Sequence, residues 1–380
     1  MVPCAVGRTG RRDGSSAHKI IKLYSTKNQK ARMQFFDIDE TKSIYDLKTG
    51  SYKKDKTLGE GAFGKVLRVQ KVTQINKKVE QKDSNYFALK ISKRFTKIKK
   101  GKRSSKEDSK NCEIPKEINF VEIRELSTLK RLSRSHHLNI VNMLDFKLQD
   151  TETWILMEYI PTDLMRFFSL NKENPKIMNE KFFKNIAHQI LSGLNHLHSE
   201  QIIHRDIKLE NILYDEKKNI AKIGDFGLSR IFDYSLESQY TDVGTYPYKP
   251  PEILLGLRKY TTAFDMWSIG CLLVQICTMS ILFGANDPIG VIKLMYDIFG
   301  SFNDNVLPGY KKFPNSNLIS NLPEKGGIGL VEYIKQKQKF KFENNDFYDL
   351  ITKMLCIDPT KRITAKECLS HLWFRNIDVI

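Results

Sequence analysis

Cysteine is scarce in this sequence, and the few cysteines present show no pairing pattern. The six of them form no CxxC pair and no Cys/His group with the spacing of zinc ligands. A disulfide-stapled scaffold and a structural zinc site are therefore not expected, and we predict a reducing location, cytoplasmic or nuclear or both. A secretory signal is missing too, because Arg8, Arg11 and Arg12 are followed by no long apolar stretch.

Long hydrophobic runs are also nearly absent. The segment Met266–Phe283 contains 18 residues without a charged side chain, which reaches the lower edge of a membrane-spanning length. Four polar side chains lower its apolarity, and Asp265 abuts its start. We therefore predict a buried core helix here and no membrane partner. The four polar residues are Ser268, Gln275, Thr278 and Ser280.

Negative charge is in deficit. The 380 residues contain 62 Lys and Arg against 44 Asp and Glu, a formal net charge of +18. The basic residues are densest before residue 40 and between Lys93 and Lys116. Such runs attract nucleic acid, but a nucleic-acid binder interleaves them with aromatic residues, and here there is little beyond Phe95. We therefore expect solvated basic loops and no nucleic acid as primary partner.

The order of hydrophobic patterns indicates an α+β fold. Residues 1–51 are polar and basic without sustained periodicity, which predicts a flexible extension before a domain that begins at Tyr52. Alternation with period two predicts strands, and recurrence at three and four residues predicts helices. A strand-rich first part thus precedes a helix-rich second part. The predicted strands are 65–70, 86–91 and 154–159, and the predicted helices are 115–132, 182–198 and 266–279.

A glycine-rich loop opens the predicted domain. Gly59, Gly61 and Gly64 stand in the spacing GxGxxG and lead into the strand that begins with Lys65 and Val66. Closely spaced glycines allow the backbone to close over phosphate groups. Three glycines in a hairpin are common, so the motif alone is weak. A dinucleotide-binding loop would lead into a helix instead.

A lysine ends the second apolar strand, where packing gives no reason for a cation. Lys90 in the run FALK could hold the phosphates of a nucleotide if an acidic side chain oriented it. Glu125 on the following predicted helix is the preferred partner, and Glu122, one turn earlier, is the alternative. Taken singly, a lysine and a glutamate are more often solvated surface charges.

The run from Ile203 to Asn211, IHRDIKLEN, carries the strongest chemical signal. Asp206 would accept the proton of an attacking hydroxyl, Lys208 would steady the transferring phosphate, and Asn211 would ligate magnesium. Fourteen residues later Asp225 begins the DFG sequence and would be the second magnesium ligand. The order and spacing of these motifs indicate phosphoryl transfer.

With these motifs, the chain from 52 to 375 resembles the eukaryotic protein kinase family, serine/threonine type, most of all the cyclin-dependent and mitogen-activated branch. Three later segments carry that likeness: 250–256 (PPEILLG), 265–271 (DMWSIGC) and 358–364 (DPTKRIT). The resemblance implies two lobes, a small antiparallel sheet with one regulatory helix (52–160) and a larger helical lobe (161–375). It also implies that Arg362 pairs with Glu252.

The resemblance further implies that ATP and Mg²⁺ bind in the cleft between the lobes. Met157 would stand at the back of the adenine pocket, and Glu158 and Ile160 would offer backbone hydrogen bonds. Lys208, with Gly244 and Thr245, is similar to the serine/threonine-specific pattern. The implied nucleotide-binding residues are Leu58, Gly59, Glu60, Gly61, Ala62, Phe63, Gly64, Val66, Ala88, Lys90, Glu158, Ile160 and Leu213.

Regulation follows from the same resemblance. Arg124, Arg205 and Arg230 stand where similar kinases gather arginines around a phosphorylated loop residue, which implies an upstream kinase. Thr241 is the preferred acceptor and Tyr240 the alternative. Segment 115–125 partly resembles a cyclin-contacting helix, so a cyclin-like activator is one possible partner beside protein substrates. Lys249 stands where the proline-directed branch has Arg, which leaves proline-directed specificity open, and a pseudokinase scaffold is the alternative function.

Overall fold

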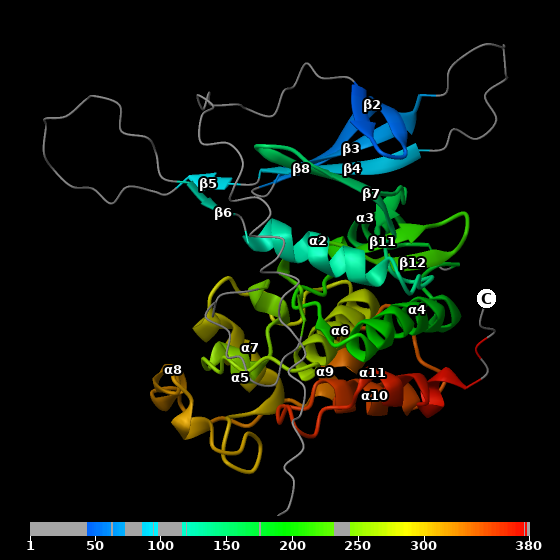
Figure 1. The fold of residues 1–380 in the computed structure, drawn as a ribbon. Helices are drawn as coiled ribbons and strands as arrows, with labels where there is room; N and C mark the ends of the chain where they lie inside the picture. The colour runs from blue at the N-terminus through cyan, green and yellow to red at the C-terminus, as the bar shows by residue number, and fades with distance from the viewer. Residues whose placement is uncertain are drawn as a thin grey trace, which may run out of the picture. The chain divides into compact units, whose positions relative to one another are not determined.

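The computed structural model describes residues 44–61, 64–72, 86–93, 95–97, 116–118, 120–174, 176–231, 244–375 and 377. These residues belong to one compact unit, Ser43–Ile380. In it a β-sheet is followed along the chain by a mainly helical lobe (Figure 1). This confirms the α+β, two-lobed prediction.

The sheet is antiparallel and has the strand order β1-β2-β3-β4-β8-β7. In β3 apolar side chains alternate with polar ones, so one face of the strand is buried, with Leu67 and Val69 fully buried, whereas β8 buries the consecutive residues 153–156. The strand bounds are β1 Ile44–Leu47, β2 Gly50–Gly61, β3 Gly64–Lys71, β4 Tyr86–Lys93, β7 Met143–Leu148 and β8 Glu152–Glu158.

The sheet begins earlier than the sequence indicated. β1 pairs with β2 from Ile44, so residues 44–51, which we had assigned to a flexible extension, are part of the sheet. Tyr45 is 2% exposed and packs edge-to-face on Trp154, with ring centroids 5.1 Å apart. A four-residue strand was too short to show periodicity among its polar neighbours, and its aromatic anchor provides the stabilisation.

The regulatory helix α2 spans Phe120–Leu132, so its start at Pro115 was predicted wrongly. Residues Lys116–Ile118 form strand β6 instead, which pairs with β5, Phe95–Lys97. Proline suits a first helical turn, but pairing between segments distant in sequence overrode that local preference.

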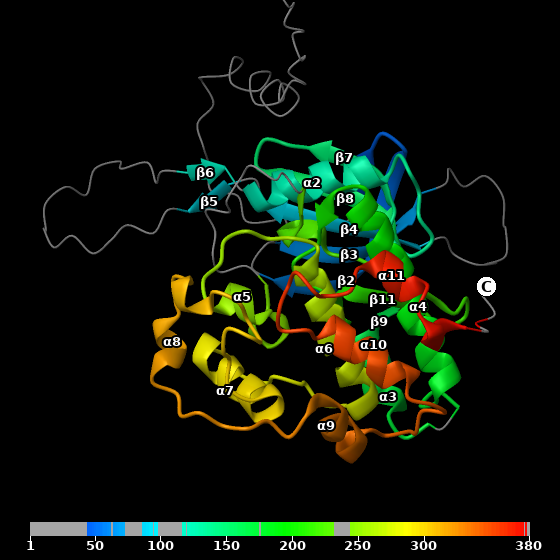
Figure 2. The ribbon, with the colours of Figure 1, turned by 90° about the horizontal axis from the view of Figure 1, so that it is seen from below.

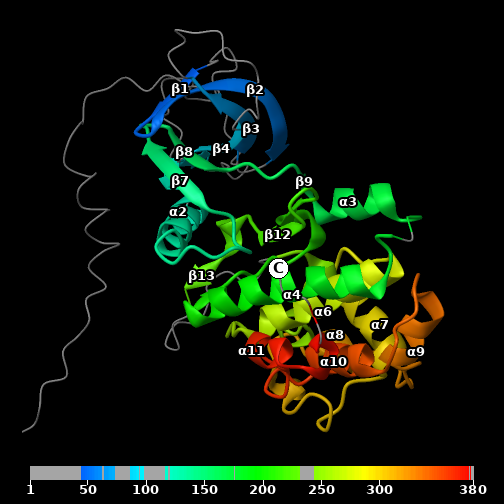
Figure 3. The same cartoon turned by 90° about the vertical axis from the view of Figure 1, so that its right-hand side faces the viewer.

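Helices α3 and α4 of the second lobe begin at Asp and Asn, residue types whose side-chain oxygens commonly cap helix starts. Asp163 accepts a hydrogen bond from the backbone of Arg166 at the start of α3, and Asn179 does the same for Phe182 in α4. Figure 2 and Figure 3 show the lobe from two further sides. Its helices are α3 Leu164–Asn171, α4 Glu180–Ser199, α5 Pro251–Leu254, α6 Ala263–Thr278, α7 Pro288–Phe299, α8 Asn317–Ser320, α9 Leu330–Lys337, α10 Asp346–Met354 and α11 Ala365–Leu369.

Helix α6 is the centre of this lobe. Every residue from Phe264 to Thr278 is buried, which confirms the predicted core helix. In the described part of the chain, we find no helix with the length and apolarity needed to cross a membrane.

Short strands carry the segments nearest the cleft. A three-stranded sheet has the order β12-β11-β9, and β10 pairs with β13. The bounds are β9 Thr162–Asp163, β10 Ile202–Ile203, β11 Ile212–Asp215, β12 Ile220–Ile223 and β13 Arg230–Ile231. The loops after β10 and β12 contain the two aspartates of the predicted chemistry, Asp206 and Asp225, so these strands position them.

Candidate active site

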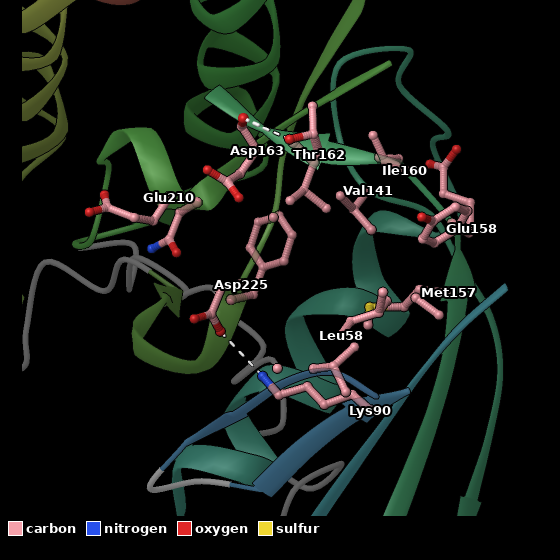
Figure 4. Close-up of a pocket in the computed structure, with 18 of the residues that line it drawn as sticks. Leu58, Lys90, Val141, Met157, Glu158, Ile160, Thr162, Asp163, Glu210 and Asp225 are labelled. Atoms are coloured by element: carbon pink, nitrogen blue, oxygen red, sulfur yellow. Dashed lines mark hydrogen bonds and ion pairs between the residues drawn. The ribbon is translucent and has the colours of Figure 1, made fainter. Parts of the chain in front are cut away.

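A cavity of about 450 Å³ lies where the sheet meets the helical lobe (Figure 4). Residues far apart in sequence line it, from the sheet, from α2, from the segment after β8 and from the small sheet. Among them are thirteen residues predicted from sequence: Leu58, Gly59, Glu60, Gly64, Val66, Ala88, Lys90, Glu125, Glu158, Ile160, Asn211, Leu213 and Asp225. Met157, predicted at its back, lines it too. Gly61 ends β2, and Ala62 and Phe63 lie outside the described residues.

Sequence reasoning missed several lining residues. Val141, Thr162 and Arg166 contribute to the cavity; Asp163, which the sequence placed near the crossing between the lobes, lines it too. Val141 precedes β7 and showed only as an ordinary apolar residue. Arg166 could have been inferred once Asp163 was recognised as a helix cap, because α3 then begins at the cavity wall.

Lys90 joins the two lobes through carboxylates. Its Nζ donates to both carboxylate oxygens of Glu125, at 2.6 and 2.8 Å, and to Oδ1 of Asp225 at 3.2 Å. Figure 4 shows Lys90 pointing toward Asp225. Burial alone would lower the pKa of Lys90, but the two carboxylates raise it above its ordinary value, so the amine stays charged. The structure thus pairs Lys90 with Glu125, the preferred partner from sequence.

Asp225 is held in a left-handed backbone conformation, with φ of 57°. Such a conformation costs energy in a non-glycine residue and persists where neighbours determine it. The next residue, Phe226, is 1% exposed and packs against the His204 ring at 5.3 Å. Burial of Phe226 therefore aims the Asp225 carboxylate at the cavity. Burial would raise the pKa of Asp225, but the neighbouring Lys90 lowers it overall.

A second hydrogen-bonded group fixes the Asp206 carboxylate. Lys208 Nζ lies 2.8 Å from Oδ2, and the Thr245 hydroxyl donates to Oδ1 at 2.8 Å. Asn211 Nδ2 donates to Oδ2 at 2.9 Å and to the Asp206 backbone oxygen at 2.8 Å. Because both bonds use Nδ2, the amide oxygen of Asn211 faces away from Asp206.

The two groups share one hollow. A space of about 230 Å³ is lined by Lys90, Asp206, Lys208, Asp225 and Thr245, with five neighbours. A hydroxyl bound there would lie beside a carboxylate that can accept its proton and a lysine that can hold an anion. The arrangement can therefore support group transfer from a molecule in the larger cavity.

Helix α6 supports the loop that contains Asp206. The fully buried carboxylate of Asp265 accepts the backbone N–H groups of His204 and Arg205, each at 2.8 Å, and Nε2 of His198 at 2.9 Å. Burial alone would raise the pKa of Asp265, but the hydrogen bond from His198 and the interactions with His198 and His204 lower it.

Three arginines gather beside this loop. Burial, together with the positive charges of Arg124 and Arg230, lowers the pKa of Arg205 to about 10. Arg124 and Arg230 therefore lie near enough to Arg205 for their positive charges to act on it, and we call the three residues the arginine cluster. The phosphorylation candidates Thr241 and Tyr240 lie outside the described residues.

The chain from the DFG sequence at Asp225 to Glu252, which we call the activation segment, is anchored at its end. Arg362 Nη1 and Nη2 donate to the two oxygens of Glu252, at 2.9 and 3.1 Å. The Arg362 side chain is 0% exposed and that of Glu252 is 6% exposed. This is the pair implied by the resemblance, and its two-pronged geometry fixes the segment on the helical lobe.

The oxygen donors of the site suit magnesium. No cluster of three or more His, Cys, Asp or Glu side chains is placed to hold a metal within the portion of the chain that the structure describes. Magnesium needs no such cluster, because it binds through one or two carboxylates, retained waters and substrate phosphates. Asn211 and Asp225, both on the cavity wall, offer an amide oxygen and a carboxylate that fit this pattern.

Comparison with known proteins agrees with this geometry. The protein kinase domain family matches residues 52–374. The chain belongs to the protein kinase family. This kinase is similar to Cyclin-dependent kinase 1 of Encephalitozoon cuniculi (strain GB-M1), 31% identical over 332 residues that cover 87% of this chain and 99% of the relative. It is also similar to Cyclin-dependent kinase B2-1 of Oryza sativa subsp. japonica, 29% identical, with 86% and 90% covered. The predicted family and its cyclin-dependent-like branch are confirmed.

Proposed function

We propose that this kinase transfers the γ-phosphate of ATP to serine or threonine hydroxyls of protein substrates. One observation carries the proposal above the others: Asp206, Lys208 and Thr245 are hydrogen-bonded together in one hollow with Lys90 and Asp225. Such a grouping places a proton acceptor, a phosphate-binding lysine and a candidate metal ligand within reach of one hydroxyl.

Nucleotide binding would use the larger cavity. Val66, Ala88 and Leu213 offer apolar walls for the adenine ring, and the backbone of Glu158 and Ile160 offers hydrogen-bonding groups at the cavity edge. Lys90, kept charged by its carboxylates, would hold the phosphates below the glycine-rich loop. Asn211 and Asp225 would hold Mg²⁺, which neutralises charge on the phosphates when bound.

The chain's own residues would then perform the transfer. Asp206 accepts the proton of the attacking hydroxyl as the O–P bond forms and the bond to the leaving oxygen of ADP breaks. Lys208 lies 2.8 Å from the Asp206 carboxylate and stabilises negative charge on the moving phosphate. Serine/threonine specificity is supported by Lys208 and Thr245, whose side chains hydrogen-bond at 3.1 Å.

Regulation and organisation extend the proposal. An upstream kinase would phosphorylate Thr241 or Tyr240, and the arginine cluster around Arg205 would bind that phosphate. A cyclin-like protein would contact α2, whose Glu125 pairs with Lys90. The kinase domain would span 44–375, since β1 belongs to its sheet, with lobes divided at 160, and it would act in the cytoplasm, the nucleus or both. We do not favour a scaffold without activity, because Lys90, Asp206 and Asp225 are all present and line the same hollow.

The direct test compares the wild type with Asp206→Asn, using labelled phosphate from Mg-ATP, a generic basic protein and mass spectrometry of the products. We expect wild-type transfer to serine or threonine, a loss of at least about 10³-fold in the variant, and little change in nucleotide binding. Equal transfer by both proteins would refute the role of Asp206. Transfer to tyrosine alone would refute the proposed specificity.

A further inference from the structure

Four exposed lysines alternate along one short segment of the helical lobe. Lys335 and Lys337 end helix α9, and Lys339 and Lys341 follow directly. We call these four residues the lysine row. Figure 3 shows α9 at the end of the helical lobe farthest from the β-sheet. None of the four forms an ion pair with a carboxylate among the residues that the structure describes.

The usual structural explanation covers only half of the row. Lysines in the last turn of a helix interact favourably with its C-terminal dipole, which accounts for Lys335 and Lys337. Their ammonium groups also lie over the rings of Tyr348 and Tyr333, at 5.1 and 4.7 Å, which orients them. Lys339 and Lys341 lie beyond the helix and gain nothing from this effect.

A hollow of about 420 Å³ adjoins the row. Lys339 lines it together with Lys172, which follows α3, so two cations from distant parts of the chain meet there. Met178 and Met279 supply apolar wall, and flexible methionine side chains adapt to varied partners. Met279 adopts a left-handed backbone with φ of 53°, a strained conformation that turns the chain at the end of α6.

Nearby acidic residues do not neutralise this surface. Glu173 lines the same hollow, and Glu332 on α9 already accepts a hydrogen bond from Gln336. The carboxylate of Glu180, at the start of α4, is occupied by the backbone of Glu343 and the indole of Trp373. The four lysines of the row and Lys172 outnumber the carboxylates of Glu173, Glu332 and Glu343, and two of the lysines, Lys172 and Lys339, line the partly apolar hollow itself.

The aromatic residues of the segment are not available to a nucleic acid. Phe340 and Phe342 alternate with the lysines but pack inward, with ring centroids 5.7 and 5.9 Å from that of Phe183. Phe342 also stacks on Phe347 at 3.8 Å. Binding of single strands depends on exposed rings that stack on bases, so the chemistry favours a protein partner.

We propose that the lysine row and its adjoining hollow dock an acidic peptide segment of a protein substrate, one that carries an apolar side chain. The row pairs with the carboxylates, and the hollow receives the apolar residue. The inference rests on the proposed kinase function, since it names a class of substrate for that activity.

Helix α3 sets the scale for reaching the active site. It begins beside Asp163, on the nucleotide cavity, and ends beside Lys172, on the hollow. Its eight residues span about 12 Å. A flexible spacer of about ten residues has a root-mean-square length of roughly 17 Å, so a substrate docked on the lysine row can reach past the length of α3 to the nucleotide cavity, which shares Lys90 and Asp225 with the hollow beside Asp206. Docking then raises the local concentration of the acceptor hydroxyl.

The experiment compares two serine peptides, one bare and one joined through a Gly/Ser spacer to a tail of glutamates around a leucine. The test variant is K335Q/K337Q/K339Q/K341Q. The matched control, K293Q/K311Q/K312Q/K366Q, removes the same charge from exposed lysines on α7, α11 and the segment before α8. We expect the test variant to raise KM for the tailed peptide about tenfold, with kcat and turnover of the bare peptide unchanged.

Several outcomes would decide whether the lysine row is a docking site. An equal rise in KM with the control variant, or no preference of the wild type for the tail, overturns the docking site. If neither peptide is phosphorylated, the proposed activation is missing, and anisotropy of the labelled tail decides docking: weaker binding by the test variant alone supports the site, and equal binding by wild type and both variants overturns it. A single-stranded oligonucleotide that loses affinity for the test variant and is not displaced by the tail overturns the choice of partner. Equal melting temperatures exclude misfolding of the variants.

Discussion

The carboxylate of Asp265 makes a sharp test of how the fold supports the catalytic loop. It is 0% exposed and accepts three hydrogen bonds, from the backbone of His204 and Arg205 and from His198. Asparagine retains one acceptor oxygen and turns an NH₂ group toward a donor. Hydrogen bonds to a charged acceptor contribute about 1.5–3 kcal/mol each, so losing one or two should cost about 1.5–6 kcal/mol of unfolding free energy.

Activity should fall as well, because the same loop carries Asp206. We expect Asp265→Asn to lower kcat by at least about tenfold, since small misplacements of reacting groups are costly. Urea unfolding at 25 °C gives the stability change, and phosphate transfer gives the rate. The matched control is Asp349→Asn, whose carboxylate also accepts two side-chain hydrogen bonds, from Lys353 and His371, but is 53% exposed.

The lowered pKa of Asp265 also predicts how the stability difference between wild type and Asp265→Asn changes with pH. The pKa of Asp265 is lowered in the folded state from an ordinary value of 3.8, so its contribution is present above pH 3.8 and lost as pH falls further. The stability gap between wild type and Asp265→Asn should therefore narrow below about pH 4. The control should cost under about 1 kcal/mol. A loss in Asp265→Asn no larger than that in Asp349→Asn would refute the reasoning.

Three further changes test other parts of the site. Glu125→Gln should lower kcat/KM by at least about tenfold in steady-state assays and cost about 3 kcal/mol of unfolding free energy, because the buried Lys90 loses its charged partner and keeps only Asp225; unchanged kinetics would contradict this. Gly244→Ala should cost about 1–3 kcal/mol in thermal unfolding, because φ is +87° and the new Cβ would meet a backbone oxygen at 2.6 Å. Arg362→Lys should cost about 3 kcal/mol in urea unfolding, since one ammonium cannot make both bonds to Glu252; a neutral result would show that charge alone suffices.

Much of the active site was predictable because phosphoryl transfer demands particular residue types at fixed spacings. Asp206, Lys208 and Asn211 lie within one loop, so their proximity follows from the chain itself. Lys90 was expected at the end of its strand and lies within β4 instead, yet a lone lysine in an apolar strand has few acidic partners on the next helix. The sequence therefore offered few alternatives to Glu125 as the partner of Lys90, and the structure pairs these two side chains.

Features that depend on long-range contacts were not predictable in the same way. Strand β1 is stabilised by Tyr45 against Trp154, more than a hundred residues away, so its four residues carry no local signal. The start of α2 was misplaced because β6 pairs with β5 across a long insertion. Val141 entered the cavity wall only through the packing of its neighbours.

Helix α6 shows how one buried helix serves both the fold and the predicted catalytic loop. Its polar residues lowered its apolarity enough to argue against a membrane span, and Ser268 and Gln275 among them hold the segment before α5. Ser268 donates to the backbone of Tyr248, and the Tyr248 hydroxyl donates to Gln275, at 2.9 and 2.5 Å. Asp265, one turn earlier, holds the loop of Asp206. Helix α6 therefore holds both the loop that contains Asp206 and the segment around Tyr248. A substitution that displaces one of these segments should therefore also shift the position of the other.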